Sequence, residues 1–324
     1  MTKVKTTSDA VCRDTASHLS RRQFCQNTLA ASALTATAML WPMGQAMARS
    51  KTIGNAVITT YSDGTMSIPS NMLFDTDAHP EVKPLLEQSG MGQGTADRPL
   101  NITLVDIGDR RILFDAGSGP NFLPGLGELP SELEAADIAL DSITDVVFTH
   151  AHPDHIWGVI DDFDDIAMTE ARFYMPHQEW DFWDSEDALA AMPAGRESFA
   201  VGAKTRFDAL RDQIELIDFN QEIIPGIEVV DSRGHTPGHA AFTVHTGDTP
   251  VMVVGDALTH EFISFQHPDV TNLSDMDGAQ AIASRLRLLD RLAADQMLLI
   301  GYHLPAPGFG RVERQGQHYQ YIQA

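Results

Sequence analysis

Cysteine is nearly absent from this chain of 324 residues, which has only Cys12 and Cys25, both close to the N-terminus. Two cysteines are too few for a disulfide framework or for a zinc site built from thiolates alone. Basic residues are also scarce, since 22 lysines and arginines stand against 45 aspartates and glutamates, a formal charge of −23. A chain this acidic repels phosphate backbones and anionic lipids at long range, so we expect no nucleic-acid partner.

The sequence also lacks an apolar run long enough to cross a bilayer. Its N-terminal apolar run, residues 29–41, is shorter than the roughly 20 residues that a spanning helix needs. A basic segment with Arg21-Arg22 precedes this run, and the small-residue triplet Ala46-Met47-Ala48 follows it. That order is typical of a signal peptide with its cleavage site. The arginine pair resembles a twin-arginine export signal, although Cys25 and Gln26 depart from the usual pattern.

Export has consequences for the composition of the mature protein. We expect residues 1–48 to be removed and residues 49–324 to form one periplasmic or secreted domain, which no membrane holds after cleavage. The mature chain would then have 17 basic against 43 acidic side chains, a formal charge of −26, and no cysteine. Any transition metal must therefore be held by nitrogen and oxygen atoms.

Strand-like and helical patterns occur in both halves of the mature chain, which predicts a layered α/β sandwich. Asp63-Gly64 and Gly108-Asp109 are expected turns, and Ser131 with Glu134 has the spacing of a capping box at a helix start. Residues 66–99 show little periodicity and predict a long loop or arm. The expected strands are 56–61, 100–107, 111–115, 145–149, 172–175, 227–231, 240–246, 251–255 and 297–301, and further helices are expected at 178–183, 198–211 and 278–294.

Four residues of the types that bind metals lie within six positions, one residue after the apolar run 146–148. The segment reads His150-Ala151-His152-Pro153-Asp154-His155, and its four polar groups can face two metal positions. Three more residues of these types follow later strand-like runs, namely His239, Asp256 and His303. Ligands on loops at strand ends are a common way for a rigid sheet to position chemistry. We expect the remaining histidines to be structural, with His235 and His260 possible supports for a ligand.

These motifs resemble those of the metallo-β-lactamase superfamily, over most of the mature chain from about residue 101 to residue 310. The resemblance implies an αβ/βα sandwich of two mixed sheets flanked by helices, with two divalent metal ions, zinc by default, in a cleft at the sheet edges. It implies that His150, His152 and His239 hold one ion, that Asp154, His155 and His303 hold the other, and that Asp256 bridges them. It also implies that Asp115 orients a ligand histidine.

Such a centre implies hydrolysis. Two ions that share one water lower its pKa and provide a metal-bridging hydroxide at neutral pH. The expected catalytic side chains are Asp154, which hydrogen-bonds the hydroxide or moves its proton, and the bridging Asp256. The same six-residue motif also occurs in lactonases, thioesterases, phosphoesterases and β-lactamases, and persulfide dioxygenases bind one iron with a subset of it. A thioester hydrolase, a β-lactamase and a mononuclear-iron persulfide dioxygenase therefore stay open as alternatives.

The segments around Asp256 and after His303 are similar to those of methyl parathion hydrolase and its exported lactonase-like relatives. This similarity implies a neutral ester as substrate, either a lactone or carboxylic ester or an organophosphate triester, in an aromatic pocket. The candidate pocket aromatics are Phe122, Trp180, Trp183 and Phe199. A small-molecule substrate is the expected partner, and a homodimer is possible by comparison with these relatives.

Overall fold

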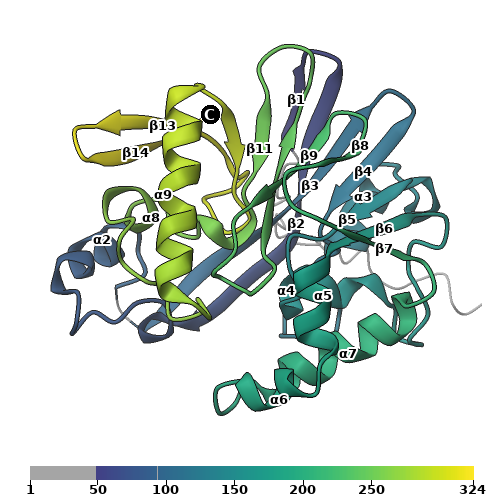
Figure 1. Cartoon of the computed structure of the whole chain (residues 1–324), viewed down its shortest axis with the longest axis horizontal. Helices are drawn as coiled ribbons and strands as arrows, with labels where there is room; N and C mark the ends of the chain where they lie inside the picture. The colour runs from purple at the N-terminus through teal and green to yellow at the C-terminus, as the bar shows by residue number, and fades with distance from the viewer. Residues whose placement is uncertain (1–48, 93) are drawn as a thin grey trace, which may run out of the picture. The chain divides into compact units, whose positions relative to one another are not determined.

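The first of two seven-stranded sheets holds the N-terminal half of the described chain (Figure 1). The computed structural model describes residues 49–92 and 94–324, so the predicted signal peptide lies outside the described residues. Strands β1 to β4 pair antiparallel, whereas β4 to β7 run parallel. In spatial order the strands are β1 (Arg49–Ile53), β2 (Ala56–Pro69), β3 (Thr95–Ile107), β4 (Arg110–Phe114), β5 (Asp145–Val147), β6 (Arg172–Pro176) and β7 (Ile214–Ile217).

The second sheet holds the C-terminal half and also follows chain order from one edge to the other. All its neighbouring strands are antiparallel except β11 and β12. The strands are β8 (Glu222–Ile224), β9 (Ile227–Asp231), β10 (Ala240–Val244), β11 (Val251–Val253), β12 (Leu298–Ile300), β13 (Phe309–Gln315) and β14 (His318–Gln323).

Helices cover the outer faces of both sheets, α3 to α7 on the first and α8 and α9 on the second (Figure 1). None of the helices in the described residues is long and apolar enough to span a membrane. The helices are α2 (Lys83–Gln88), α3 (Leu129–Ala135), α4 (Pro153–Ile156), α5 (His177–Asp184), α6 (Asp187–Ala191), α7 (Glu197–Leu210), α8 (Ile263–Gln266) and α9 (Gly278–Ala294).

Several local features of the sequence stabilise α9, the longest helix. The side chain of Asp277 accepts a hydrogen bond from the Gln280 amide, which satisfies one of the unpaired N–H groups of the first turn. Leu288, Leu289 and Leu292 repeat at helical spacing and are buried against the second sheet. Arg291 lies in the last turn, where a cation interacts favourably with the helix dipole.

A continuous apolar core joins the two sheets. Their inner faces meet in one cluster to which both contribute, and the ring of Phe114 on β4 lies 5.5 Å from that of Phe242 on β10. Alternate residues of each strand point into this core, while the others face the helices. The predicted architecture, an αβ/βα sandwich of two mixed sheets flanked by helices, is confirmed.

Three local expectations were wrong. Asp63-Gly64 is not a turn, because β2 continues through it with a bulge between Ser62 and Thr65. Ser131 does not cap α3, which begins two residues earlier; its hydroxyl donates to the Glu128 carbonyl instead. Residues 66–99 are not one loop, since β2 and β3 extend into this segment as a long hairpin that also holds α2.

Candidate metal centre

Histidine and aspartate side chains gather where strands of the two sheets end. His150, His152, Asp154 and His155 follow β5, and the loop after β9 carries His235. Asp256 follows β11, and His303 follows β12. All seven side chains are at least nine-tenths buried, so the fold brings them together out of bulk water.

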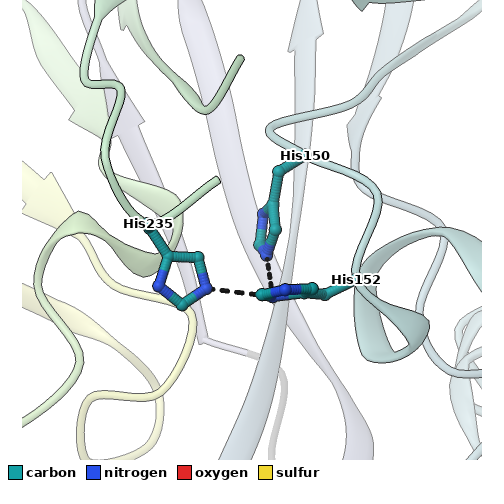
Figure 2. A group of neighbouring side chains, drawn as sticks. All are labelled: His150, His152 and His235. Atoms are coloured by element: carbon teal, nitrogen blue, oxygen red, sulfur yellow. Dashed lines mark hydrogen bonds between the residues drawn. The ribbon is translucent and has the colours of Figure 1, made fainter. Parts of the chain in front are cut away.

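Three imidazoles form the first group (Figure 2). His150 Nε2 lies 3.0 Å from His152 Nδ1, and His235 Nε2 lies 3.0 Å from the same His152 nitrogen. Figure 2 shows the rings of His150 and His235 approaching His152 from two directions. Neutral imidazole nitrogens are suitable ligands for zinc and for other divalent transition metals.

The second group combines Asp154, His155 and His303. Asp154 Oδ2 lies 3.2 Å from His303 Nε2 and 3.6 Å from His155 Nε2. The His155 ring stacks on that of Tyr302 at a centroid distance of 3.8 Å, and the Tyr302 hydroxyl donates to the Asp154 carbonyl. Tyr302 therefore fixes two members of this group at once.

Asp256 lies between the two groups. Its Oδ1 is 3.3 Å from His155 Nε2, while its Oδ2 is 3.3 Å from His303 Nε2 and 3.4 Å from His235 Nε2. One carboxylate thus contacts both sets of imidazoles, which is the geometry that a bridging ligand requires.

Asp115 orients two of the imidazoles. It receives a hydrogen bond from His155 Nδ1 at 2.8 Å and one from the Thr149 hydroxyl at 2.9 Å. Since that hydroxyl donates to Asp115, it accepts from His150 Nδ1 at 3.0 Å. Both rings then carry a proton on Nδ1 and present Nε2 to the centre.

Two further imidazole rings, those of His235 and His303, are oriented in the same way. His235 Nδ1 lies 3.0 Å from Asp275 Oδ1, and Arg285 holds the other oxygen of Asp275 at 3.1 Å. His303 Nδ1 donates to the Pro99 carbonyl at 3.2 Å. In each case the second ring nitrogen, Nε2, is left with its lone pair toward the centre.

His239 does not join these groups, so the sequence-based choice of this histidine as a ligand disagrees with the structure. Its Nε2 accepts a hydrogen bond from the Asp256 amide at 3.0 Å, and its Nδ1 is paired with the Ser232 hydroxyl at 2.8 Å. Both ring nitrogens are therefore engaged by the protein. Gly255, at φ +51°, packs on this ring, and a Cβ there would lie 2.7 Å from His239 Nε2. His239 supports the backbone that presents Asp256, and His235 lies in the position expected of His239.

The buried carboxylate of Glu179 on α5 joins the two histidine loops. Its Oε1 accepts from the Ala151 amide at 2.9 Å and from Trp183 Nε1 at 2.7 Å. Its Oε2 accepts from the Thr236 hydroxyl at 2.7 Å and from the Gly238 amide at 2.8 Å. Burial raises the pKa of Glu179, while these four donors favour the carboxylate.

The charges of the centre shift its pKa values in opposite directions. Burial and the neighbouring imidazoles hold the pKa of His150 well below its usual value. Burial also disfavours a charged His155, but Asp154, Asp115 and Asp256 outweigh it and raise its pKa well above the usual value. Burial raises the pKa of Asp256, yet His303 and His155 outweigh it and lower it overall. The carboxylates of the centre thus attract positive charge, which a metal ion bound at His155 Nε2 would supply in place of a proton.

Three buried polar atoms without hydrogen-bond partners in the described part of the chain indicate whether a metal ion fits the centre. His155 Nε2, His303 Nε2 and Asp256 Oδ1 have no hydrogen-bond partner among the described residues. Unsatisfied buried polar atoms are costly, and each of these three points toward the centre. The nitrogen and oxygen donor set fits divalent metal ions.

A pocket of about 250 Å³ opens onto the candidate metal centre. Its polar floor comprises Arg98, His152, Asp154, His235, Asp256 and His303, and its apolar wall includes Met66, Ile68, Leu73, Phe122, Leu123 and Phe199. Phe122 and Phe199 thus line it, and their rings are 6.0 Å apart.

Trp180 and Trp183 do not line this pocket, contrary to the expectation. Trp180 is buried against Phe207 at a centroid distance of 4.1 Å, with the rings stacked. Trp183 is 1% exposed, and its indole nitrogen donates to Glu179. Their spacing of three residues on α5 places both on its buried face.

Residue patterns alone did not single out several members of the site. His235 was expected to be structural because it shares the Gly234–His239 segment with His239, and either histidine satisfies the motif. Arg98, Glu179 and Asp275 lie outside any short motif. A buried charge is the one feature that distinguishes them, and burial is known only once the fold is known.

Comparisons with known proteins agree with this geometry. Residues 96–303 match the family model of the metallo-beta-lactamase superfamily. The chain is similar to AidC, a dizinc quorum-quenching lactonase in complex with its product N-hexanoyl-L-homoserine, with 27% identity over 86% of this chain and 97% of that one, and a TM-score of 0.79. It is also similar to AbOPH, a hydrolase of the beta-lactamase superfamily, with 25% identity, the same coverages and a TM-score of 0.77.

A probable metal-dependent hydrolase from Staphylococcus aureus shares the fold. It is 18% identical, with 85% of this chain and 99% of that one covered and a TM-score of 0.70. No curated protein matches the chain.

Proposed function

The chain belongs to the metallo-β-lactamase superfamily and is a metal-dependent hydrolase, and on that premise we propose that it cleaves neutral esters, lactones foremost, at a centre of two divalent metal ions. One observation carries the proposal. Two groups of ligand atoms meet at a shared carboxylate, Asp256, on the floor of a pocket with an apolar wall.

In this proposal His150, His152 and His235 hold one ion, Asp154, His155 and His303 hold the other, and Asp256 bridges them. Zinc is the proposed metal, since the donor set suits it and AidC is a dizinc enzyme. When bound, such ions polarise the ester carbonyl and make water a better nucleophile at neutral pH.

Asp154 is the side chain that we propose to move the proton. It lines the pocket, and His155 and His303 outweigh burial and lower its pKa, so it is a carboxylate at neutral pH. A carboxylate beside the attacking water accepts its proton and later returns it to the leaving oxygen. His303, His155 and Tyr302 keep Asp154 in place.

The pocket wall supports a substrate with a hydrocarbon part. Met66, Ile68 and Leu73 come from the β2 end, and Phe122 and Phe199 come from the loop after β4 and from α7. Burial of an alkyl chain against such a surface is favourable by about 0.8 kcal/mol per CH₂. An acyl lactone combines this chain with a neutral, reactive carbonyl, and AidC binds a hexanoyl product.

A substrate panel tests the proposal. The purified, zinc-loaded protein is assayed with an acyl lactone, an aryl ester, a phosphotriester, a thioester and a β-lactam, and its metal content is measured. We expect two zinc ions per chain and the highest kcat/KM for the lactone, with the phosphotriester as a slower activity. Preference for the thioester or the β-lactam would contradict the substrate assignment, and one iron per chain with oxygen consumption on a persulfide would contradict hydrolysis.

Export and assembly are separate parts of the proposal. We propose that the twin-arginine route takes the chain to the periplasm or beyond, where a protein without cysteine forms no disulfide. Replacement of Arg21 and Arg22 by lysine is expected to retain the precursor in the cytoplasm, as seen by cell fractionation.

A homodimer, proposed by comparison with exported relatives, is tested by light scattering of the mature protein.

A further inference from the structure

Arg98 is a buried cation that the metal ligands do not explain. It lies on β3, is 5% exposed and lines the pocket floor beside the candidate metal centre. Its Nε and Nη2 have no hydrogen-bond partner among the residues that the structure describes. A guanidinium carries five N–H donors in a planar fork, and leaving them unpaired in a buried site is costly.

The carboxylate of Asp256, which lies near Arg98, does not accept a hydrogen bond from its guanidinium group. Arg98 Nη2 lies 3.8 Å from Asp256 Oδ2, which is an ionic contact but too long for a hydrogen bond. The same Asp256 oxygen lies 3.3 Å from His303 Nε2 and 3.4 Å from His235 Nε2, so it faces the candidate metal centre. With its charge committed there, Asp256 cannot also neutralise Arg98.

The free N–H groups can bind an oxygen that enters through the pocket, either of water or of a substrate. Burial lowers the pKa of Arg98, while Asp256, Asp154 and Asp275 favour its charged form. An arginine fork matches the two oxygens of a carboxylate better than any single neutral acceptor does. Apart from Arg196 and Ser274, the wall above the polar floor is apolar, so the buried guanidinium of Arg98 selects where the polar end of a substrate lies.

We propose that Arg98 binds the carboxylate oxygen that hydrolysis creates, and the same oxygen while its negative charge develops. This inference rests on the proposed function. Water adds across the acyl C–O bond, the ring oxygen leaves as an alcohol, and the products are one carboxylate, one alcohol group and one proton. Only the carbonyl group of the cleaved ester gains a lasting negative charge, so Arg98 contacts the lactone carbonyl, and the alkyl chain lies along the apolar wall.

Because negative charge develops on the substrate carbonyl oxygen during the reaction, its contact with Arg98 affects kcat and KM differently. The carbonyl oxygen of the substrate is neutral, and its hydrogen bond to a guanidinium strengthens as charge accumulates. Loss of the fork is therefore expected to lower kcat more than it raises KM. A purely structural Arg98 would instead change the metal content or the melting temperature.

The experiment compares Arg98→Met, Arg98→Lys and Arg196→Met in the zinc-loaded protein. Arg98→Met removes the charge at similar length, whereas Arg98→Lys keeps the charge and loses the fork. Arg196 lines the same pocket but is half-buried, so its variant controls for the total pocket charge. Calorimetric titration with hexanoate and with N-hexanoyl-homoserine measures carboxylate binding without turnover.

We expect Arg98→Met to retain two zinc ions and to bind both carboxylates about ten- to a hundredfold more weakly, as expected for a lost charged hydrogen bond. Binding by Arg98→Lys is expected to fall between those of wild type and Arg98→Met. Arg196→Met is expected to stay within about threefold of wild type, because water screens a charge that is only half-buried. Unchanged carboxylate binding in Arg98→Met, an equal loss in Arg196→Met, or loss of zinc from both Arg98 variants would overturn the inference. Absence of ester turnover in the wild type would instead contradict the proposed function. The calorimetric titration needs no turnover, so it tests carboxylate binding by Arg98 whether or not the ester is cleaved.

Discussion

Asp275 Oδ1 lies 3.0 Å from Nδ1 of His235, and this pairing repeats on the other side of the centre, where Asp115 Oδ2 lies 2.8 Å from Nδ1 of His155. A carboxylate behind an imidazole fixes its tautomer and makes its free nitrogen a better metal ligand. His239 has no such carboxylate, because a serine hydroxyl and a backbone amide occupy its two nitrogens. The Asp256 amide occupies Nε2 of His239, whereas Nε2 of His235 faces Asp256 Oδ2 at 3.4 Å, and this difference distinguishes the supporting histidine from the ligand.

Substitution of the two histidines tests this distinction. We expect His235→Ala to reduce bound zinc from about two ions per chain to about one, because a ligand atom is removed. His239→Gln is expected to keep both ions, since an amide oxygen can still accept the hydrogen bond from the Asp256 amide. Zinc is measured by atomic emission after gel filtration. Loss of zinc from His239→Gln together with full retention in His235→Ala would restore the sequence-based assignment.

Asp275→Asn tests the support of His235 without removal of a ligand. We expect zinc affinity to fall about 10- to 100-fold, as is common when a carboxylate behind a ligand histidine is neutralised. Activity is expected to return at higher zinc concentration, which a folding defect would not allow. Asp269→Asn, an exposed neighbour in sequence, is the matched control and is expected to behave as wild type. Equal zinc affinity in the two variants would contradict the role of Asp275.

Local patterns predicted the parts of this protein that depend on neighbours in sequence. The segment from His150 to His155 and the helix of residues 278–294 were both recognised, because motif spacing and amphipathic period are local properties. The choice between His235 and His239 was not local, since its deciding partner, Asp275, lies 40 residues beyond His235. Trp180 and Trp183 were misplaced for a similar reason, because the packing of α5 on α7 decides which face of the helix is buried.

Glu179→Gln tests how the two histidine loops are held. An amide presents one acceptor oxygen to four donors, so at least one buried N–H or O–H group loses its partner. We expect the free energy of unfolding to fall by about 1–3 kcal/mol, with a lower kcat because both loops shift. Denaturant unfolding and steady-state kinetics measure the two effects. Glu186→Gln on the exposed surface is the control, and equal stability of the two variants would contradict a bracing role for Glu179.

Phe199→Ala tests the apolar wall. Phe199 contacts Phe122 at 6.0 Å between ring centroids and lines the pocket, so its removal exposes a bound acyl chain to water. We expect KM to rise about five- to thirtyfold for an octanoyl lactone, from about 1–2 kcal/mol of lost apolar contact, and to change less for a butanoyl lactone. Trp180→Phe, buried on α5 away from the pocket, is expected to leave the chain-length dependence unchanged. The same KM change for both chain lengths would show that Phe199 does not contact the acyl chain.

His260 makes stability depend on pH. Burial and the charge of Arg98 lower the pKa of His260 to about 3, and its Nδ1 accepts hydrogen bonds from the Phe262 and Ile263 amides, both at 3.2 Å. In the unfolded chain a histidine titrates near about 6.5. Between these values the unfolded state binds the extra proton, so stability is lost as the pH falls below about 6.5, down to about 3.

His260→Asn removes this titration and keeps an acceptor near Nδ1. We expect the slope of unfolding free energy against pH, measured by urea unfolding in chelator between pH 4.5 and 6.5, to decrease by up to about 1.4 kcal/mol per pH unit. Ser89→Ala removes the partner of His260 Nε2 but not the titrating ring, so it is expected to lower stability by a similar amount at each pH. A His260→Asn profile parallel to wild type would show that the proton taken up on unfolding belongs to other groups.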